Sequence, residues 1–171
     1  MSRGARAWIL WTSALLGLVA LAWMGAVVYV DVQAGREIAE LQRTYRTSSG
    51  GRFERRASPF ALILLRGCPA LPRLVGALDP ADDASYTATL STLIHSIVTQ
   101  SHGERTVSPE AANFRMRMID LHIDVADPPE ERERKIRELR RWWTEEGAAR
   151  HPAWRFWTSG CPSPIVDPDP N

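Results

Sequence analysis

Twenty-four consecutive residues without a charged side chain, from Ala7 to Val30, constrain this chain more than any other feature. A helix rises about 1.5 Å per residue, so a helix of this length crosses a hydrocarbon core of about 30 Å. Thr12 and Ser13 are its distinctly polar residues, and a helix satisfies its own backbone groups, as lipid requires. The segment is therefore predicted to be a transmembrane helix.

Aromatic residues stand toward both ends of this segment, with Trp8 and Trp11 at one end and Trp23 and Tyr29 toward the other. Membrane-spanning helices place such rings at the membrane–water boundary. The competing interpretation is a cleaved signal peptide with Ala20-Leu21-Ala22 as its cleavage site. Because the apolar region of a signal peptide spans about 7–15 residues and this one is longer, we expect an uncleaved anchor.

The predicted span contains two pairs of small residues spaced four apart, Ser13 with Gly17 and Ala22 with Ala26. Such pairs let a second helix approach closely, so these four positions are candidates for helix packing in the membrane. No ionisable residue lies inside the span, which argues against a role in moving ions or protons.

Charge and composition constrain the partners. Two of the 21 basic residues precede the span and all 20 acidic residues follow it, so the remainder has a formal charge of −1. That balance argues against nucleic-acid binding. A count of nearby arginines favours the C-terminal side of the span as cytoplasmic. A short basic N-terminus before the first apolar segment, however, usually stays in the cytoplasm. We expect a bacterial inner-membrane protein with residues 1–6 in the cytoplasm and the C-terminal domain in the periplasm.

The apolar span is followed by a mixed segment, residues 31–47, that is predicted to continue as a helical stalk. Ile38, Leu41 and Tyr45 fall on one helical face together with Ala34. That face is interpreted either as a contact with a neighbouring protein or as part of a solvated spacer, and the three larger side chains are candidate partner contacts. Residues 48–57 are predicted to be a linker because Ser and Gly residues break the helix.

Residues 58–160 are predicted to form an extracytoplasmic domain of short helices, which makes the chain all-α after its span. Residues 59–65 are most simply a short buried helix that is too short to cross a membrane. Asp79 is predicted to cap the next helix, and Ser108-Pro109 to open another. Residues 119–125 also alternate as a strand would, but helix is favoured. Residues 161–171 are a proline-rich tail.

Asp127-Pro128-Pro129-Glu130 is the clearest predicted helix start, with an acidic N-cap and a capping-box Glu. The helices that begin in this way and close on ERERKIRELRRWWTEEG resemble the end of a HEAT-type helical repeat array. The resemblance covers residues 79–147. It implies an antiparallel helix stack that binds other proteins through an extended face.

One run has the residue types of a metal site, Asp120-x-His122-x-Asp124. On a strand the three side chains would share a face and hold a divalent ion. On a helix His122 points away from the two acids and the ligand set is lost. No phosphate-binding loop or hydrolase motif is present, so no catalytic residue, cofactor or metal is predicted, and a metal-dependent enzyme is kept as an alternative.

Cys68 and Cys161 both stand between Gly and Pro. In an extracytoplasmic domain they are candidates for a disulfide that ties the start of the domain to its tail. The alternative is two free cysteines that never meet.

Large aromatic residues gather near the end of the domain. Adjacent Trp142 and Trp143 diverge by about 100° on a helix, so both cannot face one small core. One alternative is a cage in which the tail folds back on the helix. The other is a binding surface, since tryptophans among arginines are typical of interface hot spots. The candidate partner contacts here are Trp142, Trp143, Trp154, Phe156 and Trp157.

Taken together, these features predict a non-catalytic, single-pass accessory or scaffold subunit. Its helical domain would stabilise a larger membrane complex, respiratory or photosynthetic in one interpretation, with complex subunits and the lipid bilayer as partners. The alternative from another class is an anchored envelope assembly factor that engages client proteins transiently.

Overall fold

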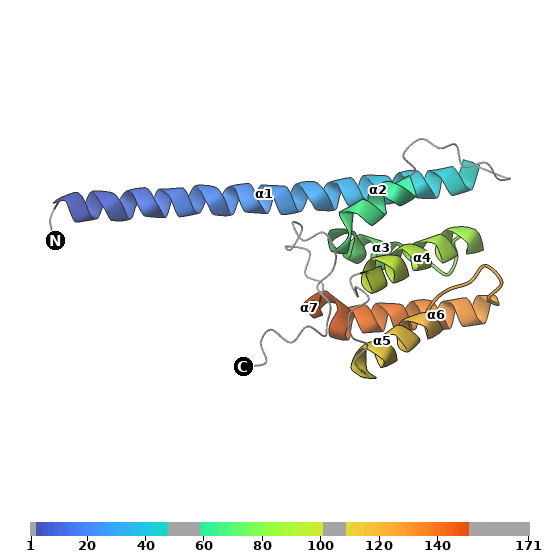
Figure 1. Cartoon of the computed structure of the whole chain (residues 1–171). Helices are drawn as coiled ribbons and strands as arrows, with labels where there is room; N and C mark the ends of the chain where they lie inside the picture. The colour runs from blue at the N-terminus through green and yellow to red at the C-terminus, as the bar shows by residue number, and fades with distance from the viewer. Residues whose placement is uncertain (1–2, 48–58, 101–108, 151–171) are drawn as a thin grey trace.

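The computed structural model describes residues 3–47, 59–100 and 109–150 of the chain. Every regular element in these ranges is a helix, so the predicted all-α class is confirmed for this part of the chain. Figure 1 shows one long helix, α1, with the other helices gathered beside its C-terminal half. The N-terminal half of α1 projects away from them.

In chain order the helices are α1 (Arg3–Thr47), α2 (Pro59–Arg66), the 3-10 turn η1 (Cys68–Ala70), α3 (Leu71–Ala77), α4 (Ala84–Gln100), α5 (Pro109–Asp120), α6 (Pro129–Trp142), the π-helical turn η2 (Trp143–Gly147) and α7 (Ala148–Arg150).

The predicted span 7–30 and the predicted stalk 31–47 form one uninterrupted helix, α1. No proline precedes Pro59 in the sequence, so every turn of α1 keeps its backbone donors. The continuation of the apolar helix beyond Val30 is therefore confirmed.

The second half of α1 belongs to the core of the domain. Ala34 and Leu41 are fully buried and Ile38 is 6% exposed. Tyr45 is half-buried, and its hydroxyl lies 2.6 Å from the Thr89 hydroxyl of α4. The contacts predicted for this face are thus corrected: Ile38 and Leu41 pack on the chain's own helices, neither on a neighbouring protein nor in solvent, because α2–α4 fold back onto α1.

A sharp bend separates α2 from the helical segment Cys68–Ala77, and the two cross at 109°. Gly67 makes this bend with a φ of 65°, a left-handed conformation that favours glycine. Its N–H donates to the Leu64 carbonyl at 3.1 Å, which closes the end of α2. The predicted short helix is confirmed, but it is only partly buried, since Ile63 is buried whereas Leu62 and Leu65 are 38% and 83% exposed.

The start of α4 differs from the prediction. Asp83, not Asp79, caps the helix, since its Oδ1 accepts the N–H groups of Ser85 at 2.8 Å and Tyr86 at 3.2 Å. The Asp79 carboxylate instead accepts the Ala81 N–H and closes a turn before the helix.

The end of α5 settles the ambiguous segment. α5 begins at Pro109 as predicted and ends at Asp120, so the helix favoured for residues 119–125 is wrong beyond Asp120. Residues 121–128 form a connection, and the alternative strand is absent there as well. The predicted acidic cap of α6 is wrong: Pro128 is the N-cap and no side chain caps the helix. The Asp127 carboxylate is occupied by Lys135 and by the Asp124 N–H.

A single cluster of buried apolar side chains joins these elements. It includes residues from α1 to α6, with members such as Leu41, Ile63, Leu74, Leu90, Ile94, Met118, Ile136 and Trp142. Because α1 contributes three members, the domain cannot close its core without the helix that also carries the apolar span.

Leu41→Ala tests the seam, which is the contact of Ala34, Ile38 and Leu41 of α1 with the helices folded back onto them. Leu65→Ala is its matched control. Leu41 is fully buried and Leu65 is 83% exposed. We expect Leu41→Ala to lower the free energy of unfolding by about 2–5 kcal/mol, because the cavity adds to the lost burial. Leu65→Ala should change it by less than about 0.5 kcal/mol. Urea unfolding of the full chain in micelles, followed by tryptophan fluorescence, measures both. Equal effects would show that α1 is not part of the domain core.

Candidate functional site

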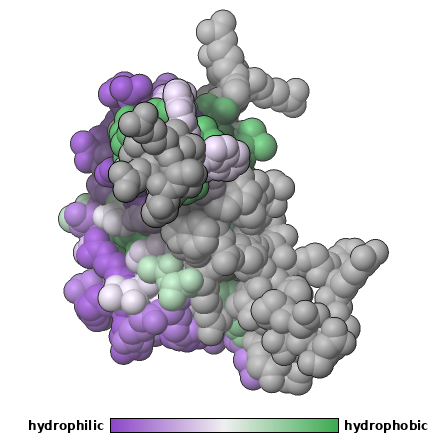
Figure 2. Space-filling model, turned by 90° about the vertical axis from the view of Figure 1, so that its left-hand side faces the viewer, coloured by the Kyte–Doolittle hydropathy of each residue, from purple (hydrophilic) through white to green (hydrophobic). Residues whose placement is uncertain are grey.

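Among the described residues, most of the exposed large apolar side chains lie on α1, chiefly on its N-terminal half. Trp8 and Trp11 are 75% and 78% exposed, and Leu15 and Val28 are 63% and 61% exposed. Figure 2 looks along α1 from its N-terminal side, with hydrophobic residues around the helix and hydrophilic residues along one flank of the domain. Among the described residues, α1 is the one unbroken helix long and apolar enough to cross a bilayer. It is a candidate membrane span or signal helix.

Two ion pairs bind α2 and α3 to α1 just beyond the apolar segment. Arg66 Nε and Nη2 donate to both carboxylate oxygens of Glu37 at 2.6 and 2.5 Å, and Arg73 donates in the same forked way to Asp31 at 2.8 and 2.5 Å. The hydrogen bond to Glu37 raises the pKa of Arg66, and the one to Arg73 lowers the pKa of Asp31. Such bidentate pairs fix orientation as well as distance.

A groove of about 570 Å³ runs between α1 and α3. Gly35, Ala39 and Gln42 line it from α1, and Pro72, Gly76 and Ala77 from α3. Charged side chains of both signs border it, namely Arg73, Arg140, Asp79 and Asp82. Ile38 and Tyr86 complete the lining, so the walls combine small residues with two larger side chains.

A second groove, of about 640 Å³, lies between α5 and α6. Its charged lining is engaged in ion pairs: Arg117 with Glu146 at 2.7 Å, and Arg134 with Glu131 and Glu138 at 2.5 and 2.8 Å. Ile119, an apolar member of the lining, is 54% exposed. The Arg117–Glu146 pair joins α5 to η2, and the two pairs of Arg134 lie within α6, so these charges are satisfied within the chain.

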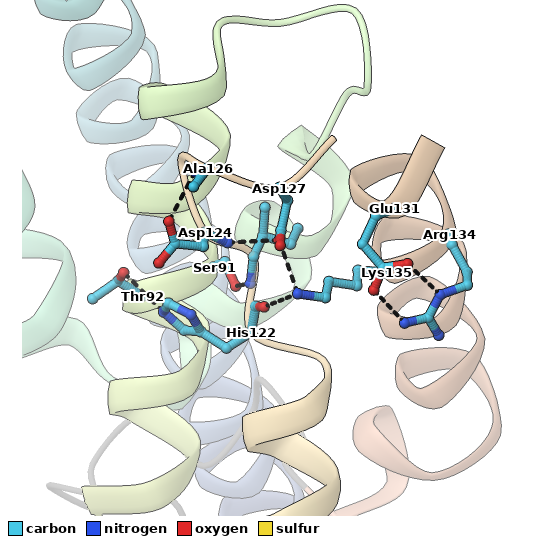
Figure 3. A network of polar contacts seen from close by, with 10 residues as sticks. Ser91, Thr92, His122, Asp124, Ala126, Asp127, Glu131, Arg134 and Lys135 are labelled. Carbon is cyan, nitrogen blue, oxygen red and sulfur yellow. Dashed lines mark hydrogen bonds and ion pairs between the residues drawn. The ribbon is translucent and has the colours of Figure 1, made fainter. Parts of the chain in front are cut away.

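A polar network holds the connection between α5 and α6 against α4 (Figure 3). The Lys135 ammonium donates to the His122 carbonyl and to the Asp127 carboxylate, each at 2.8 Å. The Ile123 N–H donates to the Ser91 hydroxyl of α4 at 2.9 Å. Burial alone raises the pKa of Asp127, but the hydrogen bonds from Lys135 and the Asp124 N–H outweigh it, and the pKa is lowered. This network positions the loop.

Two histidines meet at the edge of this network. The rings of His95 and His122 lie edge to face with centroids 5.7 Å apart, and His122 Nε2 is 3.3 Å from the Thr92 hydroxyl. Burial, with a smaller contribution from His122, lowers the pKa of His95. No sequence pattern signals this pair, because the two residues are remote in the chain.

The candidate metal ligands Asp120, His122 and Asp124 do not converge. Asp120 ends α5 exposed, His122 points toward Thr92, and the Asp124 carboxylate accepts the Ala126 N–H at 2.8 Å. Within residues 3–47, 59–100 and 109–150, no group of three or more His, Cys, Asp or Glu side chains is placed to hold a metal ion. The segment is not a strand, so the geometry that the metal-dependent alternative required is absent.

The tryptophans at the end of α6 divide between core and boundary. Trp142 is fully buried, with ring centroids 6.2 Å from Phe114 and 6.1 Å from Trp143. Its assignment as a partner contact is therefore corrected. Trp143 is half-buried and packs partly on the core. The other aromatic candidates, Trp154, Phe156 and Trp157, lie outside the described residues.

The predicted disulfide and the predicted helix packing in the span both stay predictions. Cys68 is buried at the start of η1, but Cys161 lies outside the described residues, so their disulfide stays a prediction. In the span, Ser13, Gly17 and Ala22 are exposed and Ala26 is half-buried, which leaves their role in helix packing a prediction as well.

The residues that the sequence analysis missed are the four of the two ion pairs and the small residues of the α1–α3 groove. The paired residues are 29 and 42 positions apart, so no local spacing signals them. One signal was available, since Asp31 is the first charge after the apolar segment and marks its boundary.

Comparisons of the chain with protein-family models, curated proteins and solved structures find no match. The resemblance of residues 79–147 to the end of a HEAT-type array therefore stays a prediction.

The tryptophan cluster predicts opposite effects for two glycine substitutions. A Cβ on Gly147 would lie 2.7 Å from Trp143 Cε3, whereas a Cβ on Gly76 would meet nothing within 4 Å. We expect Gly147→Ala to lower the free energy of unfolding by about 1–3 kcal/mol, since a tightly packed site resists added atoms. Gly76→Ala should raise it by about 0.5–1 kcal/mol through helix propensity. Chemical unfolding of both variants in micelles measures the two shifts, and a stabilised Gly147→Ala would contradict the packing.

The histidine pair predicts a dependence of stability on pH. Because the folded-state pKa of His95 lies below the usual histidine value of 6.5, the unfolded chain takes up a proton first as the pH falls through about 6.5. The free energy of unfolding should therefore decrease from pH 7.5 to pH 5.5. His95→Gln should show a smaller decrease than wild type. An NMR titration of the His95 ring gives the pKa directly, and a value above 6.5 would contradict this prediction.

Proposed function

We propose that this chain is a single-pass, membrane-anchored accessory or scaffold subunit that stabilises a larger membrane protein complex through its helical domain. The observation that carries the proposal is that α1 is both the exposed apolar helix and a core element of the domain. Trp11 is 78% exposed at one end, and Leu41 is fully buried at the other. A bilayer is the environment that suits the exposed half.

The continuity of α1 supports an anchor over a cleaved signal peptide. Cleavage after Ala22 would leave residues 23–33 as a helix attached to the domain core through Ala34. On that helix Met24, Val28 and Tyr29 are 56%, 61% and 62% exposed. A released domain would then carry an apolar helix into water, which is an aggregation liability.

The orientation and the host complex are part of the proposal. We place residues 1–6 in the cytoplasm and the domain in the periplasm of a bacterial inner membrane, supported by the short basic N-terminus before the first apolar segment. An energy-transducing complex, respiratory or photosynthetic, is the proposed host.

Polar side chains of the domain form hydrogen bonds and ion pairs that hold its own fold. This supports a protein that acts by contact and not by catalysis. Lys135 and Asp127 hold the loop before α6, and Asp124 closes a turn within it. A scaffold uses a rigid domain at a fixed height above the bilayer, and the ion pairs to Glu37 and Asp31 supply that rigidity.

Purification from native membranes in a mild detergent tests the proposal. We expect the chain to resist alkaline carbonate extraction and to co-purify with other membrane proteins at a constant molar ratio. A control variant with residues 7–30 replaced by a Leu/Ala span of equal length should stay in the complex, because the domain makes the contacts. Substoichiometric recovery would favour the transient assembly factor. A mature chain trimmed near residue 22 in an aqueous fraction would contradict the anchor.

A further inference from the structure

We infer that the exposed face of α2, which carries Leu62 and Leu65, rests in the headgroup layer of the bilayer that α1 crosses, and that this contact sets the direction in which α1 leans. The inference rests on the proposed function, since it requires residues 7–30 to span the membrane. It adds a second membrane contact, which the domain itself makes.

The first step is the exposure of α2. Leu65 is 83% exposed, more than any other large apolar side chain in the part of the chain that the structure describes, and Leu62 is 38% exposed. The two leucines are three residues apart and therefore share one face of the helix. Ile63 is fully buried on the side toward the core. α2 is thus apolar toward the core and apolar toward its surroundings.

The second step is the composition of the segment. α2 and Cys68–Ala77 are together apolar enough for a membrane span, although a bend of 109° divides them. The core accounts for the apolar side chains of α3, because Leu71 and Leu74 are fully buried there. An 83% exposed Leu65 has no such place in the core, so the apolar face of α2 requires a different apolar environment.

The third step is the height of α2 above the bilayer. The forked hydrogen bonds from Arg66 to Glu37 hold the C-terminal end of α2 beside a residue seven positions after Val30, which is about 10 Å further along α1. The hydrogen bond to Glu37 is the main cause of the raised pKa of Arg66, and Tyr29, at the end of the apolar segment, contributes to it. Leu65 directly precedes Arg66 and therefore lies near the membrane–water boundary, where tyrosines are enriched.

The fourth step is the tilt of α1. Its 24 apolar residues are about 36 Å long and exceed the hydrocarbon core by about 6 Å, which a tilt of about 30° takes up. α2 packs alongside α1 (Figure 1), and packed helix axes are about 8–10 Å apart, so a lean toward α2 lowers it by about 4–5 Å. The end of α2 then lies about 4–5 Å above the hydrocarbon core, within a headgroup layer about 5–8 Å thick.

The fifth step distinguishes the bilayer from a protein partner. A stable protein interface buries about 800 Å² on each side, and two leucines of an eight-residue helix offer much less. The bilayer requires no such area, because α1 already holds α2 at its surface. Side chains that enter the interfacial layer set the direction in which a long span tilts, and the two leucines do so on one side of α1.

Fluorescence quenching from position 65 tests the inference. The full chain with dansylalanine in place of Leu65 is reconstituted into phosphatidylcholine vesicles that contain a lipid with a nitroxide near the top of its acyl chain. The nitroxide should quench this reporter about twofold more than the same reporter at Val125, and iodide in the water should quench position 125 more. Val125 is the matched control, since it is 55% exposed in the connection between α5 and α6, away from the apolar half of α1 (Figure 1).

The direction of the tilt gives a second measurement. Solid-state NMR of the 15N-labelled chain in oriented bilayers reports the tilt of α1 and the side toward which it leans. We expect α1 to lean toward the flank of Glu37, on which α2 packs, and the double variant Leu62→Gln, Leu65→Gln to lean away from it. Val125→Gln should leave the direction unchanged. A lean toward another flank, or a direction that the double variant does not change, would overturn the inference.

The outcomes separate this inference from the proposed function. A reporter at Leu18, which is 64% exposed within the span, shows through a nitroxide deeper in the acyl chain whether α1 is inserted. If lipid nitroxides quench position 18 but not position 65, the inference is overturned and the proposed function stands. Protection of position 65 from both nitroxide and iodide would indicate a second copy of the chain and would overturn the inference as well. If nitroxides quench neither position, α1 does not span the bilayer and the proposed function itself fails.

Discussion

The seam between the second half of α1 and the helices folded back onto it is the contact on which the rest of the structure depends. Ala34, Ile38 and Leu41 give α1 one buried stripe, while the first half of the helix exposes its apolar side chains on all sides. Because both halves belong to one helix, the domain cannot rotate about the span without breaking the seam. Burial of the stripe thus fixes the fold and the orientation of the domain together.

The two ion pairs lie on opposite flanks of that stripe. Asp31 and Glu37 are six residues apart, which places them about 120° from each other around the helix, with the buried face between them. α3 is tied to one flank and α2 to the other. The Arg66–Glu37 pair is the more buried, with side chains 24% and 12% exposed, and is less screened by water than Arg73–Asp31 at 52% and 39%. An apolar stripe alone permits sliding along the helix, and forked pairs on both sides oppose it.

Helix positions that depend on local chemistry could be predicted, and those that depend on remote partners could not. A proline at or next to the first helical position marked the starts of α5 and α6, because its effect is confined to its own turn, but the acidic cap predicted at Asp127 was wrong. By sequence, Asp79 and Asp83 are equally suitable caps for α4. In the structure Asp83 is the cap and Asp79 closes the preceding turn, where Gln42 of the remote helix α1 donates to Asp82. The stripe around Ile38 predicted a buried face but not what would cover it. The groove escaped prediction for the same reason, since its two walls are about forty residues apart.

In the proposed membrane-anchored state, the bilayer would strengthen the contact between α1 and the helices folded onto it. Asp31 follows the last residue of the apolar segment directly, so its pair with Arg73 lies in the headgroup layer when the span is inserted. Water is scarcer there than around the same pair in solution, and an attraction between opposite charges increases as the local dielectric constant falls. The hydrogen bond from Arg73, which already lowers the pKa of Asp31, keeps the carboxylate charged in that setting. In the proposed anchored state, insertion of α1 and docking of α3 onto it would therefore be coupled through the Arg73–Asp31 pair.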